Sequence, residues 1–104
     1  MVPKKHVKDL FAYDEDLAAA VFSRLPKIAR AVKKSNPAIK GMNIINNNGE
    51  VAYQSVFHSH IHLVPRYTDQ DDFKIIFKDN SAKYDEDKYK EIQQAIVKQM
   101  EDEQ

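Results

Sequence analysis

The sequence FHSHIHLVPR, residues 57–66, is the stretch that decides the fold and the function of this chain. Three of the four histidines alternate there with residues that do not titrate, as His58, His60 and His62. Successive side chains of a β-strand point to opposite faces, so this alternation predicts that all three imidazoles share one face. Each imidazole has two ring nitrogens that need partners, and burying such a row without a ligand, a metal or a hydrogen-bond network is costly. The stretch therefore predicts a functional strand.

The composition limits the classes of protein to which the chain can belong. Its 104 residues are enough for one domain with a single modest core. Sixteen basic and sixteen acidic residues cancel without forming a long run of one sign, so binding to nucleic acid or to a membrane surface is not expected. The sequence has no cysteine, which excludes disulfides and thiolate metal ligands and favours the cytoplasm. No segment has the ~20 apolar residues that a transmembrane helix needs.

Hydrophobic periodicity predicts a long helix before the histidine stretch. Apolar residues recur at helical spacing from Leu17 to Val32, after the acidic residues 14–16. This pattern predicts an amphipathic helix over residues 15–34. Pro26 lies inside it, where the missing amide and the bulk of the ring predict a kink or a break.

The remaining elements are predicted to form an antiparallel sheet and a second helix. Strands are expected over residues 41–46 and from about 51 to 66, joined by a hairpin turn at Asn48-Gly49. Residues 73–77 alternate phenylalanine and isoleucine, which predicts a further short strand. Residues 85–100 begin with acidic residues and continue with apolar residues at helical spacing, which predicts a C-terminal helix. These elements make an α+β fold.

Three chemistries could use the three histidines: metal binding, nucleophilic catalysis at phosphorus or carbon, and a purely structural hydrogen-bond network. Between residues 39 and 67 the only acidic residue is Glu50, so carboxylate metal ligands are scarce. The same segment is rich in neutral amide and hydroxyl groups, which can hold a phosphate without a metal. These groups belong to Asn43, Asn46, Asn47, Asn48, Gln54 and Ser55. The surroundings therefore favour phosphoryl chemistry.

With its neighbours, the histidine stretch resembles the histidine triad (HIT) family of nucleotide hydrolases and transferases, most closely its bacterial branch. The resemblance is carried by His58-Ser59-His60-Ile61-His62-Leu63-Val64, by Asn47 and Gln54-Ser55 before it, and by Pro3-Lys4-Lys5-His6 further upstream. It implies a HIT-like antiparallel sheet with a central helix and a C-terminal helix. Family members have further strands and a helix before the Pro-Lys-Lys-His segment. We therefore expect a single HIT domain over residues 1–104 that lacks these N-terminal strands.

The resemblance also implies roles for the four histidines. His60 would attack the α-phosphorus of a bound nucleotide and form a nucleotidyl-histidine intermediate, which water then hydrolyses. His62 would contact the phosphate. His58 would pack behind, together with His6, and hold the constellation.

Further residues and partners follow from the same resemblance. Asn47 would bind the phosphate, and Gln54 and Ser55 would lie near the leaving group. The substrate would be a purine nucleotide, either a nucleoside phosphoramidate or a dinucleoside polyphosphate, and the protein a homodimer. No cofactor or metal is expected, because the zinc site of some bacterial members includes a cysteine pair that this sequence lacks.

Two departures from the family and two rival functions remain. Tyr53 stands where many members have glycine, and its ring is expected to narrow access to the leaving-group side. Ser59 stands where the family usually has a hydrophobic residue. The rival functions are a nucleotide-binding or interaction module without turnover, and a metal-binding protein that uses the histidines.

Overall fold

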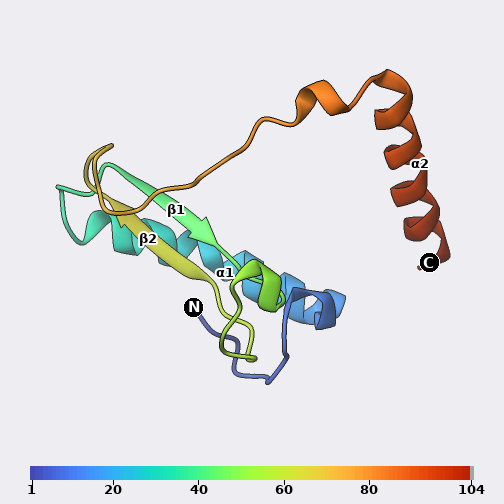
Figure 1. Cartoon of the computed structure of the whole chain (residues 1–104). Helices are drawn as coiled ribbons and strands as arrows, with labels where there is room; N and C mark the ends of the chain where they lie inside the picture. The colour runs from blue at the N-terminus through green and yellow to red at the C-terminus, as the bar shows by residue number, and fades with distance from the viewer. Residues whose placement is uncertain (104) are drawn as a thin grey trace. The chain divides into compact units, whose positions relative to one another are not determined.

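Residues 1–103 are described by a computed structural model (Figure 1). They form two compact units, of which the first is Met1–Phe73 and the second begins at Lys74. The helices and strands are α1 (Glu15–Lys34), β1 (Gly41–Ile45), β2 (His62–Arg66) and α2 (Glu86–Asp102), with short 3-10 turns at Leu10–Ala12, Glu50–Ala52 and Ser81–Lys83. Two helices with an antiparallel pair of strands confirm the α+β class.

Helix α1 has the predicted bounds. The side chain of Asp14 accepts a hydrogen bond from the backbone N–H of Leu17 at 2.8 Å and so caps the first turn. Val21 faces the core. Of the kink or break expected at Pro26, the break is wrong, because the helix continues through this residue. Pro26 is exposed, so water can bond to the carbonyl of Phe22 that loses its amide partner.

The two strands pair as predicted, but their connection is not a hairpin turn. Gly41 lies opposite Arg66 and Ile45 opposite His62 in an antiparallel register. Gly49 has a positive φ of 94°, yet the chain continues into the 3-10 turn Glu50–Ala52 instead of reversing. The second strand begins only at His62, so the expected strand from residue 51 is wrong over most of its length.

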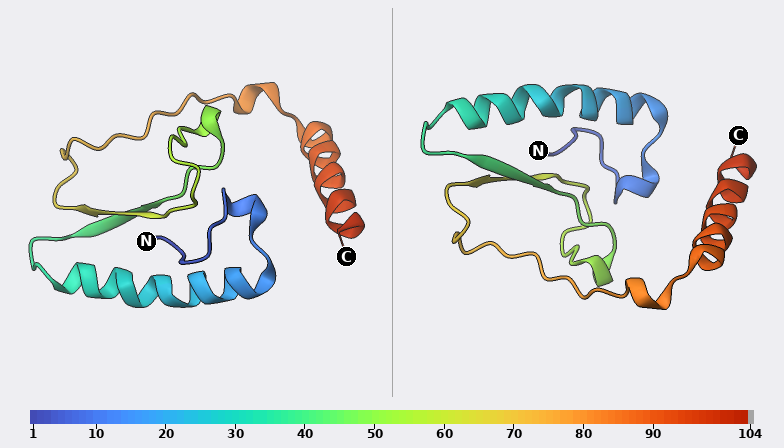
Figure 2. Two further views of the ribbon diagram at one scale, coloured as in Figure 1. Left: turned by 90° about the horizontal axis from the view of Figure 1, so that it is seen from below. Right: turned by 90° about the horizontal axis from the view of Figure 1, so that it is seen from above.

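The N-terminal segment explains why the second strand starts late. Figure 2 shows this segment between α1 and the connection of residues 46–61. The backbone N–H of Ser59 donates to the carbonyl of Val7 at 2.7 Å, and the N–H of Ile61 donates to the carbonyl of Met1 at 2.8 Å. These amides are therefore bonded to the N-terminal segment instead of to β1. The small core of this unit is built around Val7, Val21, Ile39 and Ile61.

The predicted C-terminal helix is confirmed, and the predicted strand at residues 73–77 is wrong. The side chain of Asp85 accepts from the backbone N–H of Lys88 at 2.8 Å and caps α2. Within residues 1–103, positions 73–77 form no strand. Ile76 and Phe77 are almost fully exposed, so the alternating pattern has no neighbouring strand to pack with. Neither helix of the described chain has the length and apolar composition needed to cross a membrane.

Tyr53 adopts a left-handed backbone conformation, with φ 67° and ψ 22°. This conformation costs a residue with a Cβ atom roughly 1–2 kcal/mol, and a residue that is 88% exposed regains little of that energy through packing. We expect Tyr53→Gly to raise the free energy of unfolding by about 1 kcal/mol, measured by chemical denaturation. Tyr53→Ala is the matched control, because it removes the same ring and keeps the Cβ atom. Equal stabilities of the two variants would show that the backbone is not strained.

The loop after β2 is closed by Asp71. One oxygen of its carboxylate accepts from the backbone N–H groups of Thr68 and Tyr67 and from Arg66 Nε, at 3.1, 2.8 and 3.0 Å. These hydrogen bonds, that of Thr68 first, hold the pKa of Asp71 below its ordinary value of 3.8. A lowered pKa means that the carboxylate stabilises the fold above pH 3.8 and that this stabilisation is lost as the pH falls through the folded-state value.

Replacing Asp71 with asparagine tests this loop. Asp71→Asn keeps an oxygen acceptor but removes the charge. We expect it to be less stable than the wild type at neutral pH, and the difference to shrink below pH 3.8. Thermal unfolding of both proteins across this pH range measures the effect. A difference that does not change with pH would contradict it.

Candidate active site

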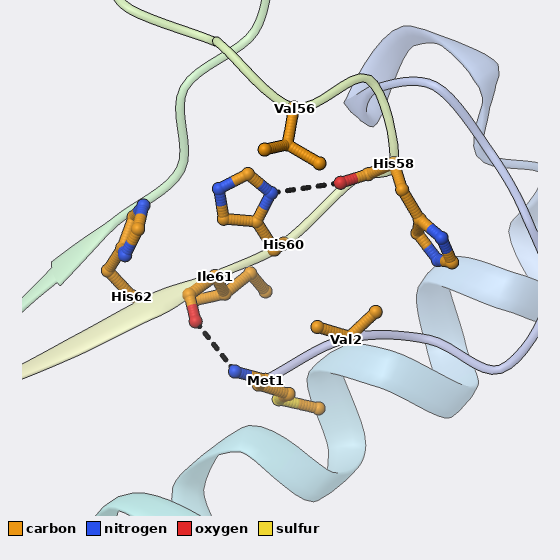
Figure 3. Close-up of a pocket in the computed structure, with 7 residues that line it drawn as sticks. All are labelled: Met1, Val2, Val56, His58, His60, Ile61 and His62. Atoms are coloured by element: carbon orange, nitrogen blue, oxygen red, sulfur yellow. Dashed lines mark hydrogen bonds between the residues drawn. The ribbon is translucent and has the colours of Figure 1, made fainter.

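The three histidines of the central stretch line one cavity of about 400 Å³ (Figure 3). The other lining residues are Met1, Val2, Val56 and Ile61. Among the described residues, no carboxylate lines this cavity. Because no carboxylate lines the cavity, a ligand that carries negative charge is not repelled there.

The imidazoles form two pairs, so the expectation of one shared face is wrong. The rings of His60 and His62 lie edge to face with their centroids 4.8 Å apart. His58 turns instead towards His6, with ring centroids 4.7 Å apart. The physical reason is that the strand begins at His62, so the alternation of a strand does not apply to the two earlier histidines.

The hydrogen bond of His60 fixes which of its ring nitrogens carries the proton. Nδ1 of His60 lies 2.9 Å from the carbonyl oxygen of His58. A carbonyl oxygen can only accept, so Nδ1–H is the donor, and the lone pair of the neutral ring is on Nε2. Figure 3 shows this second nitrogen on the side of the ring that faces His62. The geometry leaves His60 with an available nucleophilic nitrogen in the cavity.

His58, which lines the cavity, forms a hydrogen-bonded pair with His6, which does not. Nε2 of His58 lies 3.0 Å from the carbonyl oxygen of Pro3 and therefore donates to it. Nδ1 of His58 lies 3.2 Å from Nδ1 of His6, and with both rings neutral the His6 N–H donates. Both ring nitrogens of His58 are thus used inside the protein. No group of three or more His, Cys, Asp or Glu side chains within residues 1–103 is placed to hold a metal ion.

None of the three asparagines at residues 46–48 lines the histidine cavity, and within the described chain two of them have hydrogen-bond partners. Asn46 Nδ2 donates to the carbonyl of His60 at 2.9 Å, and Asn48 Nδ2 donates to Asn46 Oδ1 at 2.6 Å. Asn48 Oδ1 accepts from the backbone N–H of Leu10 at 2.7 Å. Within the described chain the half-buried side chain of Asn47 has no hydrogen-bond partner, which leaves its amide available to a ligand. The sequence analysis names Asn46 and Asn48 only among the neutral amides that can hold a phosphate, whereas in the structure their amides bond within the protein.

Gln54 is buried and holds the connection between the strands. The residue is 2% exposed. Oε1 accepts from the N–H of Gly49 at 2.8 Å, while Nε2 donates to the carbonyls of Lys8 at 2.7 Å and Val56 at 3.1 Å. The next residue, Ser55, is exposed.

Gln54 and Ser55 do not line the histidine cavity. They line a second cavity of about 490 Å³, together with Glu50, Tyr53 and Phe57. The ring of Tyr53 borders this second cavity and not the first. The structure thus places the three histidines at one cavity and Gln54 and Ser55 at another.

Comparison with known proteins agrees with this fold. The model of the HIT domain matches residues 1–69. The protein called hit in Bacillus subtilis is 38% identical over 100 residues, which cover 96% of this chain and 68% of that protein. The crystal structure of a HIT family protein from Bacillus anthracis has a TM-score of 0.87 and 40% identity, over 94% of this chain and 69% of that one.

A relative with a named activity also matches the part of the chain that carries the histidines. An adenosine 5'-monophosphoramidase of Candida albicans is 32% identical over 69 residues, which cover 64% of this chain and 45% of that enzyme. The family model covers more than half of the chain and includes all four histidines. The α+β fold, the paired imidazoles and these matches together show that the chain belongs to the HIT family.

Proposed function

We propose that this protein is a nucleotide hydrolase or transferase that acts at the α-phosphate of a purine nucleoside phosphoramidate or a dinucleoside polyphosphate. The observation that carries the proposal is the hydrogen bond from His60 Nδ1–H to the His58 carbonyl, which leaves the lone pair of Nε2 in the open cavity. A phosphoramidase among the relatives supports the first of the two substrate classes.

The proposed reaction has two displacements at phosphorus. His60 Nε2 attacks the α-phosphorus, and the bond from phosphorus to the leaving nitrogen or oxygen breaks. The leaving group takes the bonding electron pair and a proton from solvent. Water then attacks the phosphorus of the nucleotidyl-histidine and gives up a proton to solvent, the N–P bond breaks, and the electron pair of that bond returns to Nε2. Nδ1 keeps its proton throughout, because the His58 carbonyl accepts from it.

Other residues support these steps. His62 lies beside His60 and would contact the phosphate while the charge on the phosphate oxygens changes during the displacement. Asn47 would donate its amide to a phosphate oxygen, since no other group of the described chain occupies it. Gln54 would position the loop on the leaving-group side by its hydrogen bonds to Gly49 and Val56. Ser55 would contact the leaving group with its hydroxyl.

We also propose that the protein works as a homodimer. Phe22 and Ile28 on α1 leave apolar surface exposed, which a second copy could cover. Sedimentation equilibrium would test this, and a monomer at every concentration would contradict it.

Incubation with an adenosine phosphoramidate and, separately, with a diadenosine polyphosphate tests the function. We expect release of mononucleotide from at least one of them. Tight binding of mononucleotide without any release would favour an interaction module instead. Stoichiometric zinc retained after dialysis, without any response to nucleotide, would favour a metal-binding protein.

A further inference from the structure

Ser59 is a buried polar residue between two histidines of the site. The residue is 1% exposed, and its Oγ lies 2.8 Å from the hydroxyl oxygen of Tyr13. Either hydroxyl can be the donor of this hydrogen bond. A buried hydroxyl is stable only when it is hydrogen-bonded, so the two side chains depend on each other.

The backbone of Ser59 is part of the group that fixes the His60 proton. The His58 carbonyl and the Ser59 N–H belong to one planar peptide unit. The N–H donates to the carbonyl of Val7 at 2.7 Å, and the carbonyl accepts from His60 Nδ1–H at 2.9 Å. Because the unit is rigid, anything that holds Ser59 also sets the direction of the carbonyl that His60 uses.

Tyr13 provides a firm attachment for Ser59. Its backbone N–H donates to the carbonyl of Leu10 at 3.1 Å, and the next residue, Asp14, caps α1. Its ring lies near that of Phe22 on α1, with centroids 6.4 Å apart. These contacts fix the position of the Tyr13 hydroxyl relative to the first turns of α1.

We propose that Tyr13 is a positioning residue for His60. Through Ser59 it holds the His58–Ser59 peptide unit, and this unit keeps the proton of His60 on Nδ1 and the lone pair on Nε2. The consequence for turnover rests on the proposed function, whereas the consequence for the tautomer does not. Loss of the hydroxyl pair frees Ser59 to shift, which weakens the bond from His60 and allows the other tautomer.

Tyr13→Phe, Ser59→Ala and the double variant test the effect on turnover. Each single variant is expected to lower kcat about 5-fold and to leave KM unchanged, as for one lost neutral hydrogen bond. The double variant is expected to be no slower than either single variant, because all three lose the same bond. Tyr67→Phe is the matched control, since it removes a tyrosine hydroxyl from a residue outside the cavity and should leave kcat unchanged.

The stability of the same proteins separates positioning from a structural role. Each single variant leaves one buried hydroxyl without a partner, whereas the double variant leaves none, so it should recover part of the lost stability. If kcat recovers in the double variant together with stability, the positioning role is wrong. A kcat equal to that of the wild type in both single variants would also overturn it.

The ¹⁵N spectrum of the His60 ring gives a readout that needs no turnover. In the wild type we expect the tautomer with the proton on Nδ1, and in all three variants a larger share of the tautomer with the proton on Nε2. Ring spectra that match the wild type would overturn the proposal. If the wild type releases no mononucleotide, the function fails, and the ring spectra still decide the role of Tyr13.

Discussion

Replacing His60 with asparagine is expected to lower the kcat for release of mononucleotide by on the order of 10⁴-fold or more. Asparagine can still donate an N–H to the His58 carbonyl, but its amide nitrogen has no lone pair that can attack phosphorus. The variant therefore removes the nucleophile and keeps a hydrogen bond in its place. Steady-state release of mononucleotide from an adenosine phosphoramidate measures the loss.

The covalent intermediate separates His60 from its neighbour. After rapid quenching in alkali, mass spectrometry should find the added nucleotidyl group on the wild type and none on His60→Asn. His62→Asn is the matched control, because it removes an adjacent imidazole that is proposed to contact the phosphate and not to attack it. It should turn over slowly and still carry the group. Equal, slow release by the wild type and His60→Asn would contradict the assignment.

The regular elements could be predicted from the sequence because their signals are local. Helix α1 follows from its apolar spacing and the acidic residues at its start, and the structure reproduces both of its ends. The prediction of a strand at residues 73–77 is wrong because a strand depends on a contact that is not local. An alternating pattern forms a strand only where a neighbouring strand pairs with it. The long connection between β1 and β2 was missed because the N-terminal segment bonds its amides.

The residues of the site were easier to predict than their arrangement. The alternation of histidines pointed to His58, His60 and His62, but it could not show that His58 turns away from the other two. The partner of His58 is His6, 52 residues earlier in the chain. Hydrophobic or polar periodicity cannot predict a contact between residues so far apart in the sequence. Only the family resemblance placed His6 near the other three histidines.

Gln54 is expected to be the polar side chain on which the connection most depends. Its amide bonds to Gly49, Lys8 and Val56, so it joins both ends of the loop to the N-terminal segment. Gln54→Ala leaves these three backbone groups without their partner. We expect the free energy of unfolding to fall by about 3 kcal/mol, as for three lost hydrogen bonds. Chemical denaturation measures the loss.

The isosteric variant Gln54→Glu shows whether the amide donors carry this stability. An ionised carboxylate still accepts from the N–H of Gly49, but it faces two carbonyl oxygens without a proton to offer. We expect a loss as large as that of Gln54→Ala at neutral pH, and partial recovery in acid, where the protonated carboxyl donates one hydrogen bond. Gln70→Glu makes the same change at an exposed position and should be nearly neutral. If both glutamate variants are equally stable, the buried amide of Gln54 does not hold the connection.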